Sequence, residues 1–73
     1  MPEFVVSLTW DEEAGVWVAT SDDVPGLVLE SGSLDALIEQ SRYAIPELLL
    51  LNMPPDGELS ICYRSERHER IAV

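Results

Sequence analysis

The sequence contains no lysine, one cysteine and one histidine among its 73 residues. The lone Cys62 can form no intrachain disulfide and cannot supply a cysteine-rich zinc site. Apolar runs such as residues 48–51 are far shorter than the roughly 20 residues that cross a bilayer. The start of the chain, Met1-Pro2-Glu3, lacks the charged and apolar regions of a signal peptide. We therefore expect a soluble cytoplasmic protein that neither a disulfide nor zinc stabilises.

Basic residues are also scarce, and they are unevenly placed. Residues 1–63 carry twelve carboxylates against one cation, Arg42, a balance of −11, whereas residues 64–73 carry three arginines against two glutamates, a balance of +1. Affinity for DNA or RNA comes largely from Lys and Arg side chains that neutralise phosphates, so we do not expect direct nucleic-acid binding. The acidic field favours a basic protein partner instead.

The length of the chain limits the core that it can bury. Its apolar content of 47% suits a packed globule, but a chain of this size buries only about 60% of the surface that its unfolded form exposes. Small domains without disulfides or metals often gain stability by self-association. We expect a single domain over residues 1–73, with a core at about 3–64, a polar tail at 65–73, and a homodimer as the oligomeric state.

The first 21 residues predict two strands joined by a hairpin loop. Apolar residues recur at every second position of residues 4–10, the period of a half-buried strand. Residues 11–15 are polar and end in glycine, which suits a hairpin loop, and residues 16–21 predict the second strand. Pairing Trp10 with Val16 places the apolar residues of both strands on one face. In that register Trp17 lies on the opposite face, beside Val5.

A turn, a short strand and a helix follow. Pro25-Gly26 is a strong turn signal, and the third strand is expected at residues 27–30. Ser33 is a good N-cap for an amphipathic helix over residues 34–51. Within that helix Pro46 removes a hydrogen-bond donor and clashes with the preceding turn, so it predicts a kink or break near Arg42 to Ile45.

The last third of the chain predicts a loop, a strand and a polar tail. Residues 52–57 contain two prolines and a glycine and predict the loop, and the alternation of residues 59–64 predicts the fourth strand. Ile71 and Val73 either pair with a sheet edge or fray. The order predicts an α+β fold, β-β-β-α-β, with one helix packed on one face of a small antiparallel sheet.

Candidate catalytic and metal-binding residues are few. The acidic residues 11–13 and 22–23 lack the spaced ligands and central glycine of a calcium loop, and the register above puts them at opposite ends of one hairpin. His68 lies in the polar tail, where no residue is evident that would position it as a general base. Cys62 is interpreted as a small strand residue. We expect no metal, no cofactor and no enzymatic activity.

One segment of the chain resembles a known family. Gly15-Val16-Trp17-Val18-Ala19, then Asp23-Val24-Pro25-Gly26, then Gly32-Ser33-Leu34 follow one another as in the N-terminal domain of HicB-like antitoxins. The resemblance covers roughly residues 3–51. It implies a β-β-β-α-β domain of the kind that binds and silences a small RNA-cleaving HicA toxin. The C-terminal DNA-binding module of many such antitoxins has no counterpart here, and residues 45–49 are more similar to a small orphan branch of the family without established function.

Two functional hypotheses follow. The first is a non-enzymatic protein-binding module that resembles a HicB-type antitoxin and covers a small basic partner, with Val5, Trp17, Asp22 and Asp23 as the partner-binding residues. The second is an orphan structural or regulatory homo-oligomer, or a small-ligand binder, that has the same fold but no toxin partner.

Overall fold

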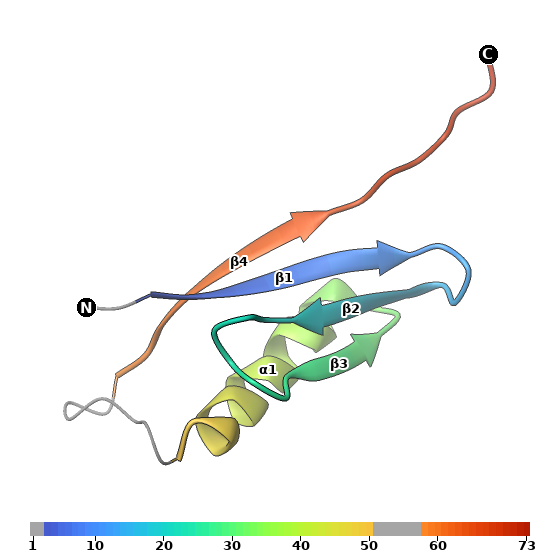
Figure 1. Ribbon diagram of the computed structural model, residues 1–73. Coiled ribbons are helices and arrows are strands. Elements are labelled where there is room, and N and C mark those ends of the chain that lie inside the picture. The colour runs from blue at the N-terminus through green and yellow to red at the C-terminus, as the bar shows by residue number, and fades with distance from the viewer. Residues whose placement is uncertain (1–2, 51–57) are drawn as a thin grey trace.

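The computed structural model describes residues 3–50 and 58–73. It contains four strands and one helix in the order that the sequence predicts, as Figure 1 shows. The elements are β1 (Glu3–Asp11), β2 (Val16–Thr20), β3 (Val28–Ser31), α1 (Leu34–Leu48) and β4 (Ser60–Glu66). The α+β fold is therefore confirmed, while the loop predicted at residues 52–57 lies outside the described residues.

The sheet is mixed rather than wholly antiparallel. Its strand order is β3-β2-β1-β4, with antiparallel pairing between β1, β2 and β3 and parallel pairing between β1 and β4. The prediction of an antiparallel sheet is wrong for β4. The reason is the helix: α1 returns the chain after β3, so β4 runs in the direction of β3, which is also the direction of β1.

The register of the first hairpin differs from the prediction by one residue. Trp10 pairs with Trp17 and Leu8 with Ala19, so Trp17 shares a face with Leu8 and not with Val5. The loop explains the shift. The Gly15 N–H donates to the Asp11 carbonyl oxygen over 2.8 Å with Gly15 at φ +68°, and this closure sets Asp11 opposite Val16. A one-residue shift exchanges the two faces of the strand.

The helix covers the face that carries Leu8 and Ala19. Apolar side chains from the sheet, the β2–β3 turn and α1 form one buried core, namely Val6, Leu8, Ala19, Val24, Leu27, Leu37, Ile45 and Leu49. The opposite face, called the outer face below, carries Val5, Val18 and Cys62 and is covered by no element among the described residues (Figure 1).

Local interactions explain where the helix begins and why it continues through Pro46. The Ser33 side chain accepts a hydrogen bond from the Ala36 N–H at 3.3 Å, which confirms it as the N-cap. The break predicted before Pro46 is wrong, because α1 runs through Pro46 to Leu48 without interruption. Pro46 lies in the last turn, where a missing donor costs one hydrogen bond, and the Leu49 N–H still reaches the Ile45 carbonyl oxygen at 3.0 Å.

Residues 67–73 extend beyond β4 and away from the rest of the fold (Figure 1). They form no helix or strand, and Ile71 is 80% exposed. Neither Ile71 nor Val73 pairs with a sheet edge of this chain. The molecule is consequently elongated, 53 × 19 × 18 Å, with a radius of gyration of 13.9 Å, against about 11 Å for a compact chain of this length.

Replacing the fully buried Leu37 with alanine should lower the free energy of unfolding by about 2–5 kcal/mol, because the change removes apolar contacts and leaves a cavity under α1. Tyr43 lies on the same helix and is 72% exposed, so Tyr43→Ala should change that free energy by less than about 0.5 kcal/mol. Urea unfolding followed by circular dichroism measures both. Equal losses in the two variants would contradict this packing of α1.

Candidate functional site

An acidic hollow lies beside the β1–β2 loop. It has a volume of about 460 Å³, and its carboxylates come from Asp11, Glu12 and Glu13. Thr9, Val18 and Thr20 line it from the outer face of β1 and β2. Trp10 also borders it, although the Trp10 ring packs on the helix face against Trp17. The hollow therefore combines an apolar wall at Val18 with three acidic side chains. This combination suits the long stem and charged head of an arginine or lysine.

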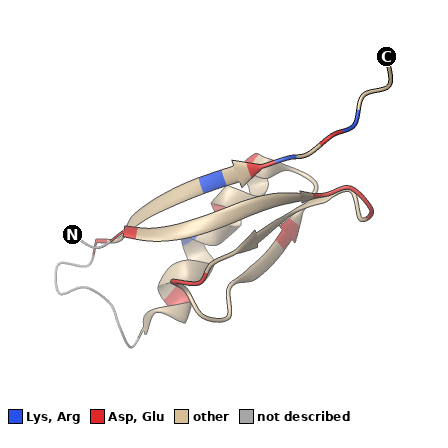
Figure 2. Ribbon diagram, turned by 45° about the horizontal axis from the view of Figure 1, so that its top comes forward, with Lys and Arg blue, Asp and Glu red and all other residues tan. Residues whose placement is uncertain are grey.

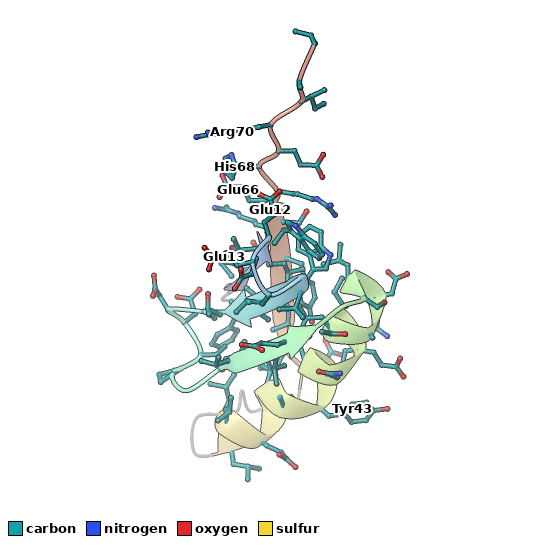
Figure 3. The ribbon with its side chains drawn as sticks, turned by 90° about the vertical axis from the view of Figure 1, so that its right-hand side faces the viewer. Glu12, Glu13, Tyr43, Glu66, His68 and Arg70 are labelled. Carbon is teal, nitrogen blue, oxygen red and sulfur yellow. The ribbon has the colours of Figure 1, made fainter. Side chains whose placement is uncertain are left out.

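Local hydrogen bonds hold the acidic loop in place. Asp11 Oδ1 accepts hydrogen bonds from the Glu13 N–H at 3.1 Å and the Ala14 N–H at 3.2 Å. The Asp11 carboxylate is thus occupied by backbone N–H groups of its own turn. Glu12 and Glu13 form no ion pair with any described residue and are exposed, so both can bind an incoming cation. Figure 3 labels the two glutamates on the β1–β2 loop.

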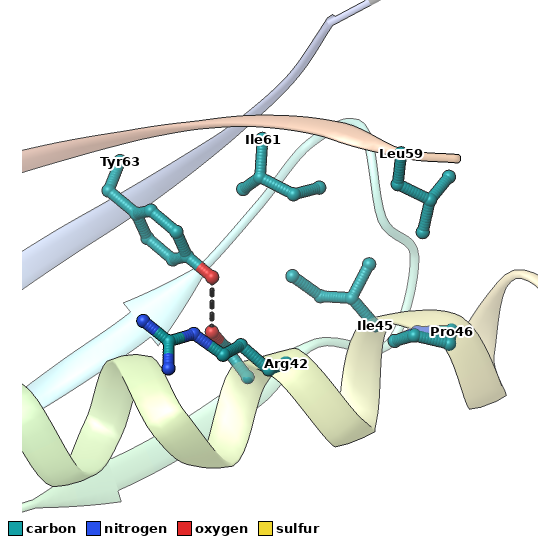
Figure 4. Close-up of a pocket in the computed structure, with 7 residues that line it drawn as sticks. Arg42, Ile45, Pro46, Leu59, Ile61 and Tyr63 are labelled. Atoms are coloured by element: carbon teal, nitrogen blue, oxygen red, sulfur yellow. Dashed lines mark hydrogen bonds between the residues drawn. The ribbon is translucent and has the colours of Figure 1, made fainter.

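A second hollow, the α1–β4 groove, lies on the helix face of the sheet. Because α1 packs chiefly against β2 and β3, space of about 370 Å³ remains between the helix and the edge strand β4. Figure 4 shows the side chains that line it, which are Ser41, Arg42, Ile45 and Pro46 from α1 with Leu59, Ile61 and Tyr63 from β4 and the residues just before it. Most of this lining is apolar.

Two hydroxyl groups join the walls of the groove. Ser41 is fully buried, and its Oγ donates to the Ile38 carbonyl oxygen at 2.6 Å. A hydroxyl has one proton, so the hydrogen bond of 2.6 Å between Ser41 and Tyr63 is donated by Tyr63. The sequence pattern does not predict this pair. Only the parallel placement of β4, which brings Tyr63 over α1, could have indicated it.

Asp23 and Val5, two of the four predicted partner-binding residues, are in direct contact. The Val5 N–H donates to Asp23 Oδ2 at 2.7 Å, and Ser21 Oγ donates to the Val5 carbonyl oxygen at 2.5 Å. These side chains continue the pairing of β1 beyond the end of β2 at Thr20. Asp23 therefore has a structural role, whereas the neighbouring Asp22 is exposed and forms no hydrogen bond or ion pair with the described residues.

Trp17 lies elsewhere. Its ring packs edge-on against Trp10, with centroids 5.5 Å apart and an interplanar angle of 62°. The Arg67 guanidinium lies over the Trp10 ring, 4.3 Å from its centroid, in the geometry of a cation–π contact. Val5 and Trp17 therefore occupy opposite faces of the sheet, and the prediction that they share one is wrong. The structure does not bring the four predicted residues into one site.

The remaining candidate residues form no catalytic or metal-binding cluster. His68 Nε2 lies 3.4 Å from Glu66 Oε1, and both side chains are largely exposed (Figure 3). Cys62 lies in β4 and is half-buried. Within residues 3–50 and 58–73 no three His, Cys, Asp or Glu side chains gather as a metal site would require. No helix in that part of the chain is long and apolar enough to cross a membrane.

Comparison with known proteins assigns the chain to a family. Residues 3–73 match the model of a domain of unknown function, DUF1902. The chain belongs to the DUF1902 family. No curated protein matches its sequence significantly.

One solved structure is similar over the whole chain. It is the hypothetical protein TTHA1013 from the extremely thermophilic bacterium Thermus thermophilus, with 40% sequence identity and a TM-score of 0.70. The similarity covers 99% of this chain and 100% of the other. The resemblance to HicB-like antitoxins stays a hypothesis.

Replacing Asp23 with alanine should lower the free energy of unfolding by about 1 kcal/mol, because the Val5 N–H loses a charged acceptor. The matched control is Asp22→Ala, which removes the same charge one residue away and should change stability by less than about 0.5 kcal/mol. Thermal unfolding of both variants measures the difference. Similar stabilities would show that the Asp23–Val5 hydrogen bond does not hold the turn.

Proposed function

We propose that this DUF1902 protein is a non-enzymatic protein-binding module, resembling a HicB-type antitoxin, that binds a small basic partner such as a HicA-like RNA-cleaving toxin. The observation that carries the proposal is the acidic hollow at residues 9–13, 18 and 20. It offers carboxylates and an apolar wall at one place, which is what an anchoring arginine or lysine of a basic protein requires.

The wider charge distribution supports the same partner. Every carboxylate from Glu3 to Glu47 is exposed, and none of them forms an ion pair with the described residues. Figure 2 shows acidic residues on the loops at both ends of the sheet and on α1. Such uncompensated charge attracts a basic protein from a distance and raises its association rate.

The binding surface proposed here differs from the one expected from sequence. Asp22 and the outer-face residue Val5 remain candidates, because both lie on the accessible side of the sheet or its loops. Trp17 and Asp23 are committed to contacts within the chain. The acidic loop at Glu12 and Glu13 and the turn at Asp22 lie at opposite ends of β2, and the hollow extends along the outer face from that loop as far as Thr20, two residues before Asp22.

The first experiment is affinity purification of the tagged protein from its native lysate at low and high salt, read by mass spectrometry. A small basic protein should be recovered in stoichiometric amount at low salt and lost at high salt, because screening weakens exposed charge pairs. Recovery of the bait alone at both salt concentrations would contradict the proposal.

The purified partner then allows a test of the hollow itself. Glu12→Gln with Glu13→Gln should weaken binding by at least about tenfold, since both carboxylates of the hollow that are not used by the backbone are neutralised. The control is Glu39→Gln with Glu47→Gln, which removes the same charge from α1. Isothermal titration calorimetry measures both affinities. An equal loss in the two variants would indicate attraction by net charge without a specific hollow.

A further inference from the structure

The strand β4 is an unprotected edge beside an open groove. In the strand order β3-β2-β1-β4 it has a neighbour on one side only among residues 3–50 and 58–73, and within that part of the chain its other side presents unpaired backbone groups. Its residues Ile61 and Tyr63 line the α1–β4 groove and are only partly buried. Natural sheets rarely leave such an edge uncovered, because it invites pairing with another strand.

Residues 67–73 carry apolar side chains at positions that can cover this groove. Along β4 the odd-numbered residues face the helix side, as Ile61 and Tyr63 do. Arg67 keeps this alternation, because its guanidinium lies on Trp10, which is on the same face. A period of two in an extended segment then places Ile71 and Val73 on that face as well. Both side chains are exposed in the single chain.

We propose that two copies of this chain pair through their β4 edges, antiparallel, about a two-fold axis near Glu66 and Arg67. Residues 67–73 of each copy then lie beside β4 of the other copy. Ile71 and Val73 cover the partner's α1–β4 groove. Because the arrangement is two-fold symmetric, both grooves and both edges are covered at once and the assembly closes as a dimer.

The charge of residues 64–73 and the direction in which they leave the fold favour a second copy of the chain as the occupant of the groove. The groove belongs to a body of charge −11, from residues 1–63, and residues 64–73 carry +1, so the segment is the basic part of an acidic protein. Within its own chain the segment points away from the body (Figure 1), and the groove residues Leu59 and Ile61 lie at the other end of β4. An antiparallel partner brings the segment to that end.

The faces of these residues also determine the register between residues 67–73 of one copy and β4 of the other. When Ile71 lies opposite Ile61 of the other copy, Val73 lies opposite Leu59, and both fall over the apolar wall formed with Ile45 and Pro46. A shift of two residues keeps them on this face, whereas a shift of one would move them to the outer face. The proposal is independent of the antitoxin-like function and does not require a toxin.

Sedimentation equilibrium on the full chain and two single variants tests the proposal. The wild-type chain should be a dimer, and Ile71→Asp should raise the dimer dissociation constant by at least about tenfold. Ala72→Asp adds the same charge at the adjacent position, which faces the other way, and should leave the constant within about twofold. Circular dichroism checks that both variants are folded.

Either of two results would overturn the proposal. A wild-type chain that is monomeric at high micromolar concentration excludes the pairing. A dimer that Ile71→Asp and Ala72→Asp weaken equally, or not at all, places the interface elsewhere, as on the outer face around Val5 and Val18.

Cross-linking to the native Cys62 provides a second measurement that does not depend on affinity. Arg70 and Ala72 share the face of Cys62 in the paired arrangement, so Arg70→Cys or Ala72→Cys should give a disulfide-linked dimer under mild oxidation. Ile71→Cys lies on the opposite face and is the control. Cross-linking that is fastest in Ile71→Cys would contradict the proposed faces.

Discussion

The closure of the β1–β2 loop is the constraint on which the rest of the structure depends. The hydrogen bond from the Gly15 N–H to the Asp11 carbonyl oxygen, with Gly15 at positive φ, sets Asp11 opposite Val16. Every later pair follows from it, because the side-chain period of a strand is two. It places Ala19 in the core and Trp17 against Trp10. It also places Val18 on the outer face, where that side chain lines the acidic hollow.

The two faces of the sheet differ in chemical character. The outer face and its loops carry the acidic hollow and most of the uncompensated charge, which suits recognition of a basic protein. The helix face carries the apolar core and, beside it, the α1–β4 groove. The groove exists because one helix is too narrow to cover four strands: α1 lies over β2 and β3 and leaves β4 partly open. A binding module and a dimer interface can therefore occupy one small domain without competing for the same residues.

Local features were predicted well from the sequence, and long-range ones were not. The turn at Pro25-Gly26, where the Leu27 N–H reaches the Val24 carbonyl oxygen at 3.1 Å with Gly26 at φ +86°, and the N-cap Ser33 follow from a few adjacent residues. The predicted register of the first hairpin was wrong because the pattern of apolar residues does not determine which backbone hydrogen bond closes the loop. The contacts of Ser41 with Tyr63 and of Arg67 with Trp10 join residues far apart in the chain, and no local pattern indicates them.

The most direct test of the account is the register of the first hairpin, since it decides which β2 residues face the acidic hollow and which face the helix. Nuclear Overhauser contacts between backbone protons of β1 and β2 measure it in solution. The structure predicts cross-strand contacts that pair Trp10 with Trp17 and Leu8 with Ala19. Contacts that pair Trp10 with Val16 and Leu8 with Val18 would contradict it, because they would return Trp17 to the outer face.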